Sequence, residues 1–263
     1  MSFAKALSLT AASLIIASVA PAAAPDAAYI QQIRSARTDR VTELVKPDSW
    51  LSLVGLQFLE PGDNSIEAEG VRLGTAILTA GNQVAVTRAA AAPATLSILV
   101  IDRGGKKALR IRDSAAAARR DFHGLDYFPI DPSWRIEARW VPYPGPHSVA
   151  ITNVLGQVSR ETAPGKAVFE RGGKTYELVP VVEAPGQPLF FIIGDETSGK
   201  ETYQMRFLDA ELPRDGKVIL DFNLAENPPC AFTDFATCPL PPQGNRLPLA
   251  ITAGEKKYRG AKD

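Results

Sequence analysis

The clearest hydrophobic pattern in the chain is the alternation from Trp134 to Trp140, which places both tryptophans on one face of a predicted β-strand. Similar short apolar stretches follow one another along most of the sequence. The other predicted strands cover residues 50–59, 94–101, 109–112, 167–169, 175–182, 189–193, 202–208 and 218–223. So many short strands predict a mainly β protein, built as an antiparallel barrel or sandwich.

Glycine-containing turns separate several of these strands. The same four residues, Arg-Gly-Gly-Lys, occur at positions 103–106 and 171–174, each time between two apolar stretches. Paired glycines favour the tight two-residue turns that join antiparallel strands, so both sites predict hairpins. Residues 61–64, Pro-Gly-Asp-Asn, predict a further turn.

Residues 26–46 have a different period. Their apolar side chains fall at near-helical spacing, at Ile30, Ile33, Val41, Leu44 and Val45. A proline at position 47 marks the end of this pattern. We therefore expect an N-terminal amphipathic helix that packs on the β-rich body.

A proline-rich segment, residues 227–245, contains both cysteines of the chain and five prolines. Proline fixes its own backbone and pushes the preceding residue towards an extended conformation, so this segment should be rigid and non-helical. A rigid loop that presents Asn227, Cys230 and Asn245 at set positions would suit a binding site.

Several long motifs carry a resemblance to a known family. DFNLAENPPCAF, TCPLPP, NRLPL and AGEK near the C-terminus resemble the bacterial family catalogued as domain of unknown function 1684. Upstream, SWLSLVGLQFLEPGDNSI, RIRD, DFHGLDYFPID and DETSGKETYQMRFL also fit its pattern. The resemblance extends from about Arg34 to Lys257 and implies no mechanism, since the family name records no established activity.

Residues 1–24 predict a signal peptide. Lys5 supplies the positive charge, Ala6 to Ala20 form a short apolar region, and small residues follow it. An uncleaved membrane anchor is the less favoured alternative, because the apolar region is short for a bilayer. We expect a secreted or periplasmic protein with one β-rich domain, residues 25–263, and no stable membrane anchor after processing. Such a compartment permits disulfides.

Charge and motif content exclude several classes of function. The chain has 29 basic and 29 acidic residues, and a nucleic-acid-binding protein would show a clustered basic face instead. No dinucleotide fingerprint, phosphate loop or metalloprotease helix occurs, so we expect no cofactor. Two cysteines without a histidine cluster do not form a zinc-site pattern, so we expect no metal.

Three arginines are candidates for anion binding. Arg110 and Arg112 share one face of a predicted strand, and Arg206 lies opposite Tyr203 on another. If the arginines converge, they form a fork for carboxylate or phosphate. The alternative is a solvated face with scattered ion pairs. The available partners are Asp113, Asp195 and Asp221.

The polar residues of the C-terminal third leave two roles open. Asp221 and Asn223 could contact a ligand or brace the following loop through hydrogen bonds to its amides. Asp195, Asp221 and Glu255 could also supply paired carboxylates for acid–base chemistry.

Cys230 and Cys238 allow three interpretations: a disulfide, two buried thiols, or a nucleophilic Cys230. A nucleophile would need a base, and the two histidines, His123 and His147, lie in no specific motif.

We therefore expect an exported protein that binds a small polar or anionic ligand in a cleft beside the proline-rich segment. The predicted ligand-binding residues are Arg110, Arg112, Asp195, Tyr203, Arg206, Asp221, Asn223, Asn227 and Glu255. The alternative is a cofactor-free hydrolase with Asp221 or Glu255 as base and Arg206 polarising the substrate.

Overall fold

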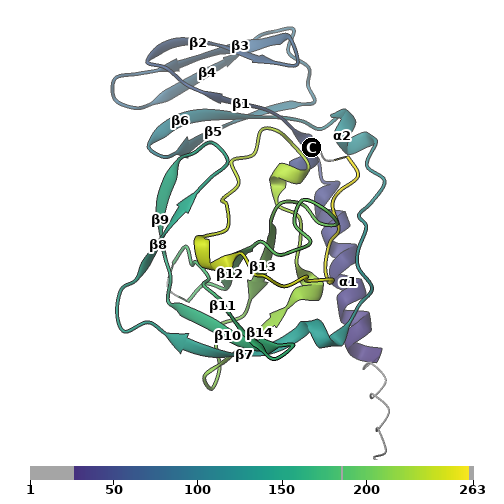
Figure 1. Cartoon of the computed structure of the whole chain (residues 1–263). Coiled ribbons are helices and arrows are strands. Elements are labelled where there is room, and N and C mark those ends of the chain that lie inside the picture. The colour runs from purple at the N-terminus through teal and green to yellow at the C-terminus, as the bar shows by residue number, and fades with distance from the viewer. Residues whose placement is uncertain (1–26, 185, 261–263) are drawn as a thin grey trace, which may run out of the picture.

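A computed structural model describes residues 27–184 and 186–260 of the chain, so the predicted signal peptide lies outside the described residues (Figure 1). The described residues form five antiparallel sheets of two to four strands, none of which closes into a barrel. The protein is thus mainly β and sandwich-like, and the barrel alternative does not apply to this part of the chain.

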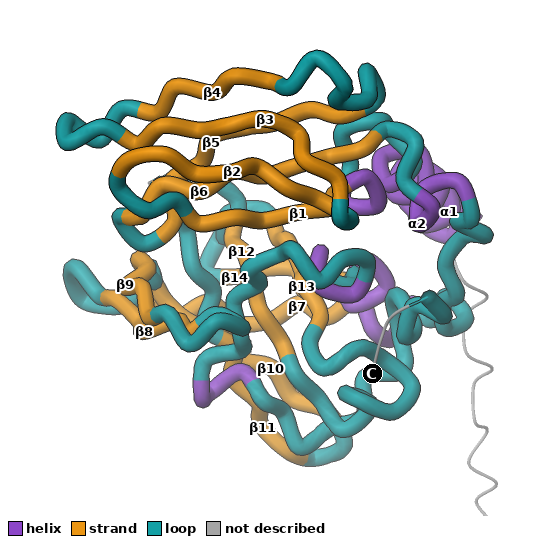
Figure 2. Tube along the Cα trace, turned by 90° about the horizontal axis from the view of Figure 1, so that it is seen from above, coloured by secondary structure: helices purple, strands orange, loops and turns teal. Residues whose placement is uncertain are grey.

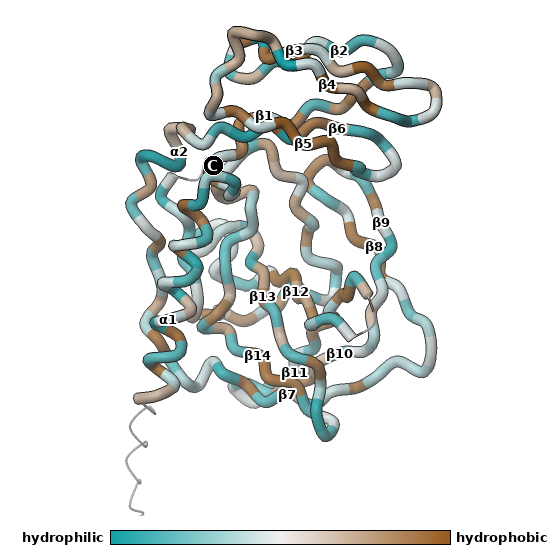
Figure 3. Tube along the Cα trace, turned by 180° about the vertical axis from the view of Figure 1, so that it is seen from behind, coloured by the Kyte–Doolittle hydropathy of each residue, from teal (hydrophilic) through white to brown (hydrophobic). Residues whose placement is uncertain are grey.

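Two three-stranded sheets stack on each other and form an N-terminal sandwich (Figures 1 and 2). The outer sheet contains β2 (Gly62–Ala68), β3 (Val71–Leu78) and β4 (Val84–Arg88). The inner sheet contains β1 (Leu53–Phe58), β6 (Lys106–Asp113) and β5 (Leu96–Arg103). Ile66, Leu73, Leu109 and Ile111 are buried between the two sheets. Figure 3 shows hydrophobic stretches along the facing strands of this sandwich.

The remaining strands form the body of the protein. Its four-stranded sheet has the order β11 (Lys174–Leu178), β10 (Gly165–Arg171), β7 (Arg135–Pro142) and β14 (Lys217–Asp221). Two strand pairs complete it: β12 (Leu189–Ile193) with β13 (Arg206–Ala210), and β8 (Ser148–Thr152) with β9 (Val158–Thr162). The largest hydrophobic cluster lies inside the body, around Phe191, Leu220 and Phe222.

The alternation around the tryptophans correctly predicts what the body buries. Trp134, Ala138 and their partly buried neighbours Ile136 and Trp140 all pack into the body core. The strand itself begins one residue later than predicted, because Trp134 belongs to a short 3-10 turn.

Both Arg-Gly-Gly-Lys motifs form the hairpins that the sequence predicts. Arg103 pairs with Lys106 across the first turn, and Arg171 pairs with Lys174 across the second. Gly104 and Gly105 have φ angles of 59° and 77°, values that this turn type requires and that other residues adopt at a cost.

Some local predictions need correction. Residues 62–64 belong to strand β2 rather than to the predicted turn. The strand predicted at 202–208 begins only at Arg206. Residues before it form turns, in which the hydroxyls of Thr197 and Thr202 lie 2.9 Å apart and bond to each other. Side-chain hydrogen bonds of this kind compete with strand pairing.

Helix α1 (Ala27–Leu44) runs along the side of the body, and α2 (Ala117–Arg120) is a single short turn (Figure 1). The side of α1 that contacts the body carries Tyr29, Ile33, Arg37, Arg40 and Leu44, at helical spacing. Only Ile33 and Leu44 are fully buried, so polar side chains provide much of this contact. No helix in the described ranges is long and apolar enough to span a membrane.

Candidate functional site

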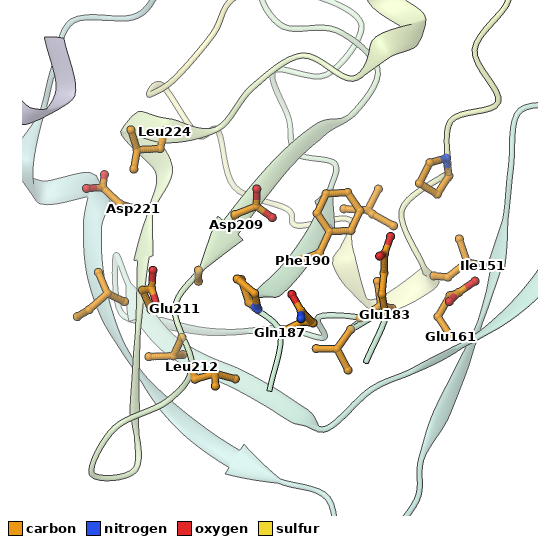
Figure 4. Close-up of a pocket in the computed structure, with 18 of the residues that line it drawn as sticks. Ile151, Glu161, Glu183, Gln187, Phe190, Asp209, Glu211, Leu212, Asp221 and Leu224 are labelled. Carbon is orange, nitrogen blue, oxygen red and sulfur yellow. The ribbon is translucent and has the colours of Figure 1, made fainter. Parts of the chain in front are cut away.

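A cleft of about 1440 Å³ opens on one side of the body (Figure 4). Strand alternation explains its floor. On β12, Leu189, Phe191 and Ile193 point into the body core, which leaves Phe190 and Ile192 facing the cleft. The proline-rich segment contributes Thr237 and Pro239 to the edge of the cleft.

The cleft has an apolar floor and a charged rim. Phe190 and Ile192 belong to a hydrophobic cluster with Ile151 and Val181, and all four line the cleft. The acidic lining residues are Glu137, Glu161, Glu183, Asp209, Glu211, Asp215 and Asp221. The basic lining residues are Arg103, Arg135, Arg214 and Lys217. Seven carboxylates against four cations give the described lining an excess of negative charge.

Asp221 is the one predicted site residue that lines this cleft. The Tyr29 hydroxyl donates to both of its carboxylate oxygens, at 2.9 and 3.0 Å. Desolvation by burial, with a further contribution from Asp221, raises the pKa of Tyr29, so the tyrosine remains a donor. The Asp221 carboxylate also accepts from the backbone N–H of Asn223 at 3.2 Å. Asp221 thus joins α1 to the end of β14.

Asn223 is buried and satisfied by protein groups. Its Oδ1 accepts from the Asp131 backbone N–H at 3.0 Å, and its Nδ2 donates to the Asp131 carbonyl at 2.8 Å. These bonds hold the loop before β7, whereas the bracing interpretation places the partners of Asn223 in the loop that follows it.

Arg206 and Asp195 form an ion pair in the interior. The Nη2–Oδ2 distance is 2.7 Å, and each side chain is 1 % exposed. Arg206 also donates to the carbonyls of Ile251, at 3.0 Å, and Ala253. Burial lowers the pKa of Arg206, and the charge of Asp195 opposes this shift. The pair ties β13 to the C-terminal residues and is closed to a ligand.

A polar cluster beneath α1 contains the carboxylates of Glu226 and Glu255, with Arg40 and Asn227 as their partners. Arg40 Nε lies 3.2 Å from Glu226 Oε2 and 3.1 Å from Glu255 Oε1. The backbone N–H of Asn227 donates to Glu255 Oε2 at 2.7 Å. The single positive charge of Arg40 therefore lies beside two carboxylates and can balance only one of the two negative charges.

This arrangement shifts both carboxylates towards their neutral forms. Burial raises the pKa of Glu255, against the opposing effects of Arg40 and Asn227. Desolvation of its carboxylate raises the pKa of Glu226 to about 7, although 37 % of the side chain remains exposed. Arg40 lowers this pKa, and the charges of Glu255 and Asp209 raise it.

Arg110 and Arg112 lie on β6, on the face opposite Leu109 and Ile111. The Cζ atom of Arg110 lies over the Trp50 ring, 5.1 Å from the ring centroid. Neither arginine shares a described partner with Arg206, and none of the three lines the cleft. The described structure therefore does not assemble the predicted anion-binding fork.

Cys230 and Cys238 are joined by a disulfide, with their Cα atoms 6.2 Å apart. Neither sulfur is therefore a free nucleophile in this state. Tyr203 donates from its hydroxyl to the Cys230 carbonyl at 3.2 Å, so this predicted site residue supports the disulfide loop.

Most of the residues that line the cleft were not predicted from the sequence. Phe190, Asp209 and Glu183 come from separate strands and loops that only the fold brings together. Arg40 was not predicted either, although Tyr29, Arg37 and Arg40 share one face of the N-terminal helix with Ile33 and Leu44.

The second half of the chain matches a known protein family. A family model described as "Protein of unknown function (DUF1684)" matches residues 120–256, which include the body strands and exclude the N-terminal sandwich. The solution NMR structure of an uncharacterized protein from Haloarcula marismortui is similar to this chain, with 34% identity and a TM-score of 0.45. That similarity covers 54% of this chain and 80% of the other. No curated protein matched.

Proposed function

Because the chain belongs to the family of unknown function DUF1684, its function must be argued from its own site, and we propose that it binds a small polar ligand in the cleft beside the proline-rich segment. The observation that carries this proposal is the cleft itself, with its apolar floor and polar rim. Concave sites of this composition are where proteins usually bind small molecules. The excess of carboxylates favours a ligand that is not an anion.

Heat protection by small molecules would test this proposal. We expect compounds recovered from the purified protein by native mass spectrometry to raise its melting temperature. Phe190→Ala, which removes part of the floor, should reduce that increase, whereas Phe235→Ala, at a residue outside the cleft, should not. If retained compounds protect both variants and the wild type equally, binding occurs elsewhere and the proposal fails.

A hydrolase is the alternative proposal, and one observation favours it. Asp209 lines the cleft, partial desolvation raises its pKa, and its charge also acts on the Glu226 carboxylate. The Glu226 carboxyl, whose pKa is raised by burial to about 7, would suit general acid–base catalysis at neutral pH. Asp221 and Glu255 are less suitable as bases because protein donors already occupy their oxygens.

An ester and amide substrate panel would test the hydrolase proposal. Glu226→Gln and Asp209→Asn should each abolish a turnover that Glu170→Gln, at an exposed site on β10, leaves intact. Turnover that survives both of the first two substitutions would exclude a role for these carboxyls.

We also propose that the protein is exported to a periplasmic or extracellular location. The predicted signal peptide and the Cys230–Cys238 disulfide support this, since disulfides persist in oxidising compartments. The intact mass of the protein recovered from the periplasm should correspond to a chain that lacks about the first 24 residues. A chain that still begins at Met1 would contradict export by this route.

A further inference from the structure

The negative charges around the floor of the cleft outnumber the positive charges, and only some of them are paired. Glu137 pairs with Lys217 at 2.6 Å, and Asp221 lies 3.8 Å from Arg135. The remaining lining acids are Glu161, Glu183, Asp209, Glu211 and Asp215, and the remaining cations are Arg103 and Arg214. Within the described residues, these five carboxylates have no hydrogen-bond or ion-pair partner.

Two of the unpaired carboxylates, Asp209 and Glu183, flank an aromatic ring. Phe190 lies directly across the β12–β13 pair from Asp209, so the two side chains are neighbours on the cleft face of this sheet. The Phe190 ring packs edge-on against Phe207, with the ring centroids 4.8 Å apart. Figure 4 shows Asp209 and Glu183 on either side of Phe190, with Ile151 and Glu161 on the far side of Glu183.

An aromatic face with carboxylates beside it attracts one kind of ligand. The face of the ring accepts an apolar group or a cation. The carboxylates attract a cation and repel an anion. The neighbouring floor residues Ile151, Val181 and Ile192 extend the apolar contact. A ligand with an apolar body and a cationic end would satisfy both parts of this surface.

We propose that the cleft takes organic amines, with the apolar body against Phe190 and the ammonium group between Asp209 and Glu183. This inference rests on the proposed binding function and specifies the class of ligand. The surroundings of the Asp209 carboxylate agree with this geometry. They raise its pKa by partial desolvation, although the residue as a whole is exposed, so the carboxylate lacks a compensating cation.

A series of probes with one skeleton and three end groups tests the proposal. The compounds are 4-phenylbutylamine, 4-phenylbutanol and 4-phenylbutyrate, titrated into the full-length protein at neutral pH. Chemical shift changes of backbone amides report the site and the dissociation constant. We expect the amine to bind about fivefold more tightly than the alcohol, and the carboxylate to bind most weakly. Added salt should weaken amine binding and leave alcohol binding unchanged.

Substitutions then separate charge from shape. Asp209→Asn with Glu183→Gln should remove most of the preference for the amine over the alcohol. Glu170→Gln, which removes an exposed carboxylate outside the described cleft lining, should retain that preference. A correctly dispersed amide spectrum would show that each variant is folded.

The outcomes distinguish the two levels of the proposal. If no probe perturbs the amides of β12 and β13, the proposed binding function fails and the amine inference fails with it. If all three probes bind there with equal affinity, the cleft binds ligands but does not select amines. Tightest binding by the carboxylate, or an unchanged preference in the double variant, would also overturn the inference.

Discussion

Arg206 shows how one residue can bind the interior of this protein together. It is among the largest fully buried side chains, and its partner Asp195 is equally inaccessible. Burial of either charge alone would be costly, and the pair is tolerated because carbonyls and hydroxyls satisfy most of the remaining positions. The role of Arg206 is therefore stabilisation of the fold rather than ligand contact.

Replacement of Arg206 should be strongly destabilising. In Arg206→Ala the carboxylate of Asp195 would remain buried without its cation, so we expect the free energy of unfolding to fall by about 3 kcal/mol. Urea denaturation would measure this loss. Arg160→Ala, at an exposed arginine on β9, is the matched control and should change stability little. Similar stabilities for the two variants would show that the buried pair contributes nothing.

Glu226 should make stability depend on pH. Its folded pKa of about 7 lies above the ordinary value of 4.5, so between these values the folded state keeps a proton that the unfolded state has lost. This contribution to stability is therefore present at low pH and decreases as the pH rises through this range. Arg40, Glu255 and Asp209 are the charged groups that act on this carboxylate.

A neutral replacement tests this dependence. Relative to the wild type, Glu226→Gln should become progressively more stable as the pH increases from about 4.5 to about 7. Urea unfolding of both proteins at several pH values gives the difference directly. Glu170→Gln should show a constant difference over the same range. A constant difference for Glu226→Gln as well would mean that its carboxyl titrates normally.

At the scale of elements, the proline-rich segment is held by the disulfide and by contacts to its neighbours. The sulfur atoms belong to a small cluster with Met205 and Ala236. Phe232, in the same segment, packs with Leu44 and Leu51. The segment thus connects the end of α1 to the body, and its rigidity positions Thr237 and Pro239 at the cleft.

Removal of the disulfide should loosen this segment. We expect Cys230→Ser with Cys238→Ser to lower the free energy of unfolding by about 2–3 kcal/mol, because the unfolded chain gains entropy when the loop is opened. Thermal denaturation would show a lower melting temperature. A reducing agent should destabilise the wild type to a similar degree and leave the double variant unaffected. An unchanged melting temperature in the variant would contradict this role.

At the scale of the whole molecule, the described residues enclose two separate large hydrophobic cores. The N-terminal sandwich encloses one core and the body encloses the other. Figure 1 shows the inner sheet of the sandwich between its outer sheet and the body. Arg110 and Arg112 lie on the face of that sheet opposite the sandwich core, so the contact with the body is partly charged.

This division predicts unequal local stability. Ile66→Ala would leave a cavity in the sandwich core and cost about 3 kcal/mol. Native-state hydrogen exchange should then accelerate in β2, β3, β5 and β6 more than in β7, β10 and β12. Leu208→Ala, in the body core, should give the reverse pattern. Equal acceleration everywhere would show that residues 25–263 unfold as the single domain that the sequence predicts.

The sequence by itself determined the local structure wherever one residue type or period dominates. Alternation predicts the buried face of β7, and paired glycines predict both hairpins, because these signals act over neighbouring residues. Other strands lack a clear alternation of apolar and polar residues. β4 and β9 are largely exposed on both faces, so their sequences alternate little and neither was predicted.

Only the tertiary structure decided which polar residues meet. Asp195 and Arg206 pair across a turn, Arg40 reaches Glu255 from another element, and Asp221 takes Tyr29 as its partner. These partners lie 11, 215 and 192 residues apart in the sequence. Their pairing produces no local sequence pattern, because ion pairs and hydrogen bonds require proximity in space and no fixed spacing along the chain. The cleft follows the same rule: its floor and its unpaired carboxylates come from strands and loops that only the folded sheets bring side by side.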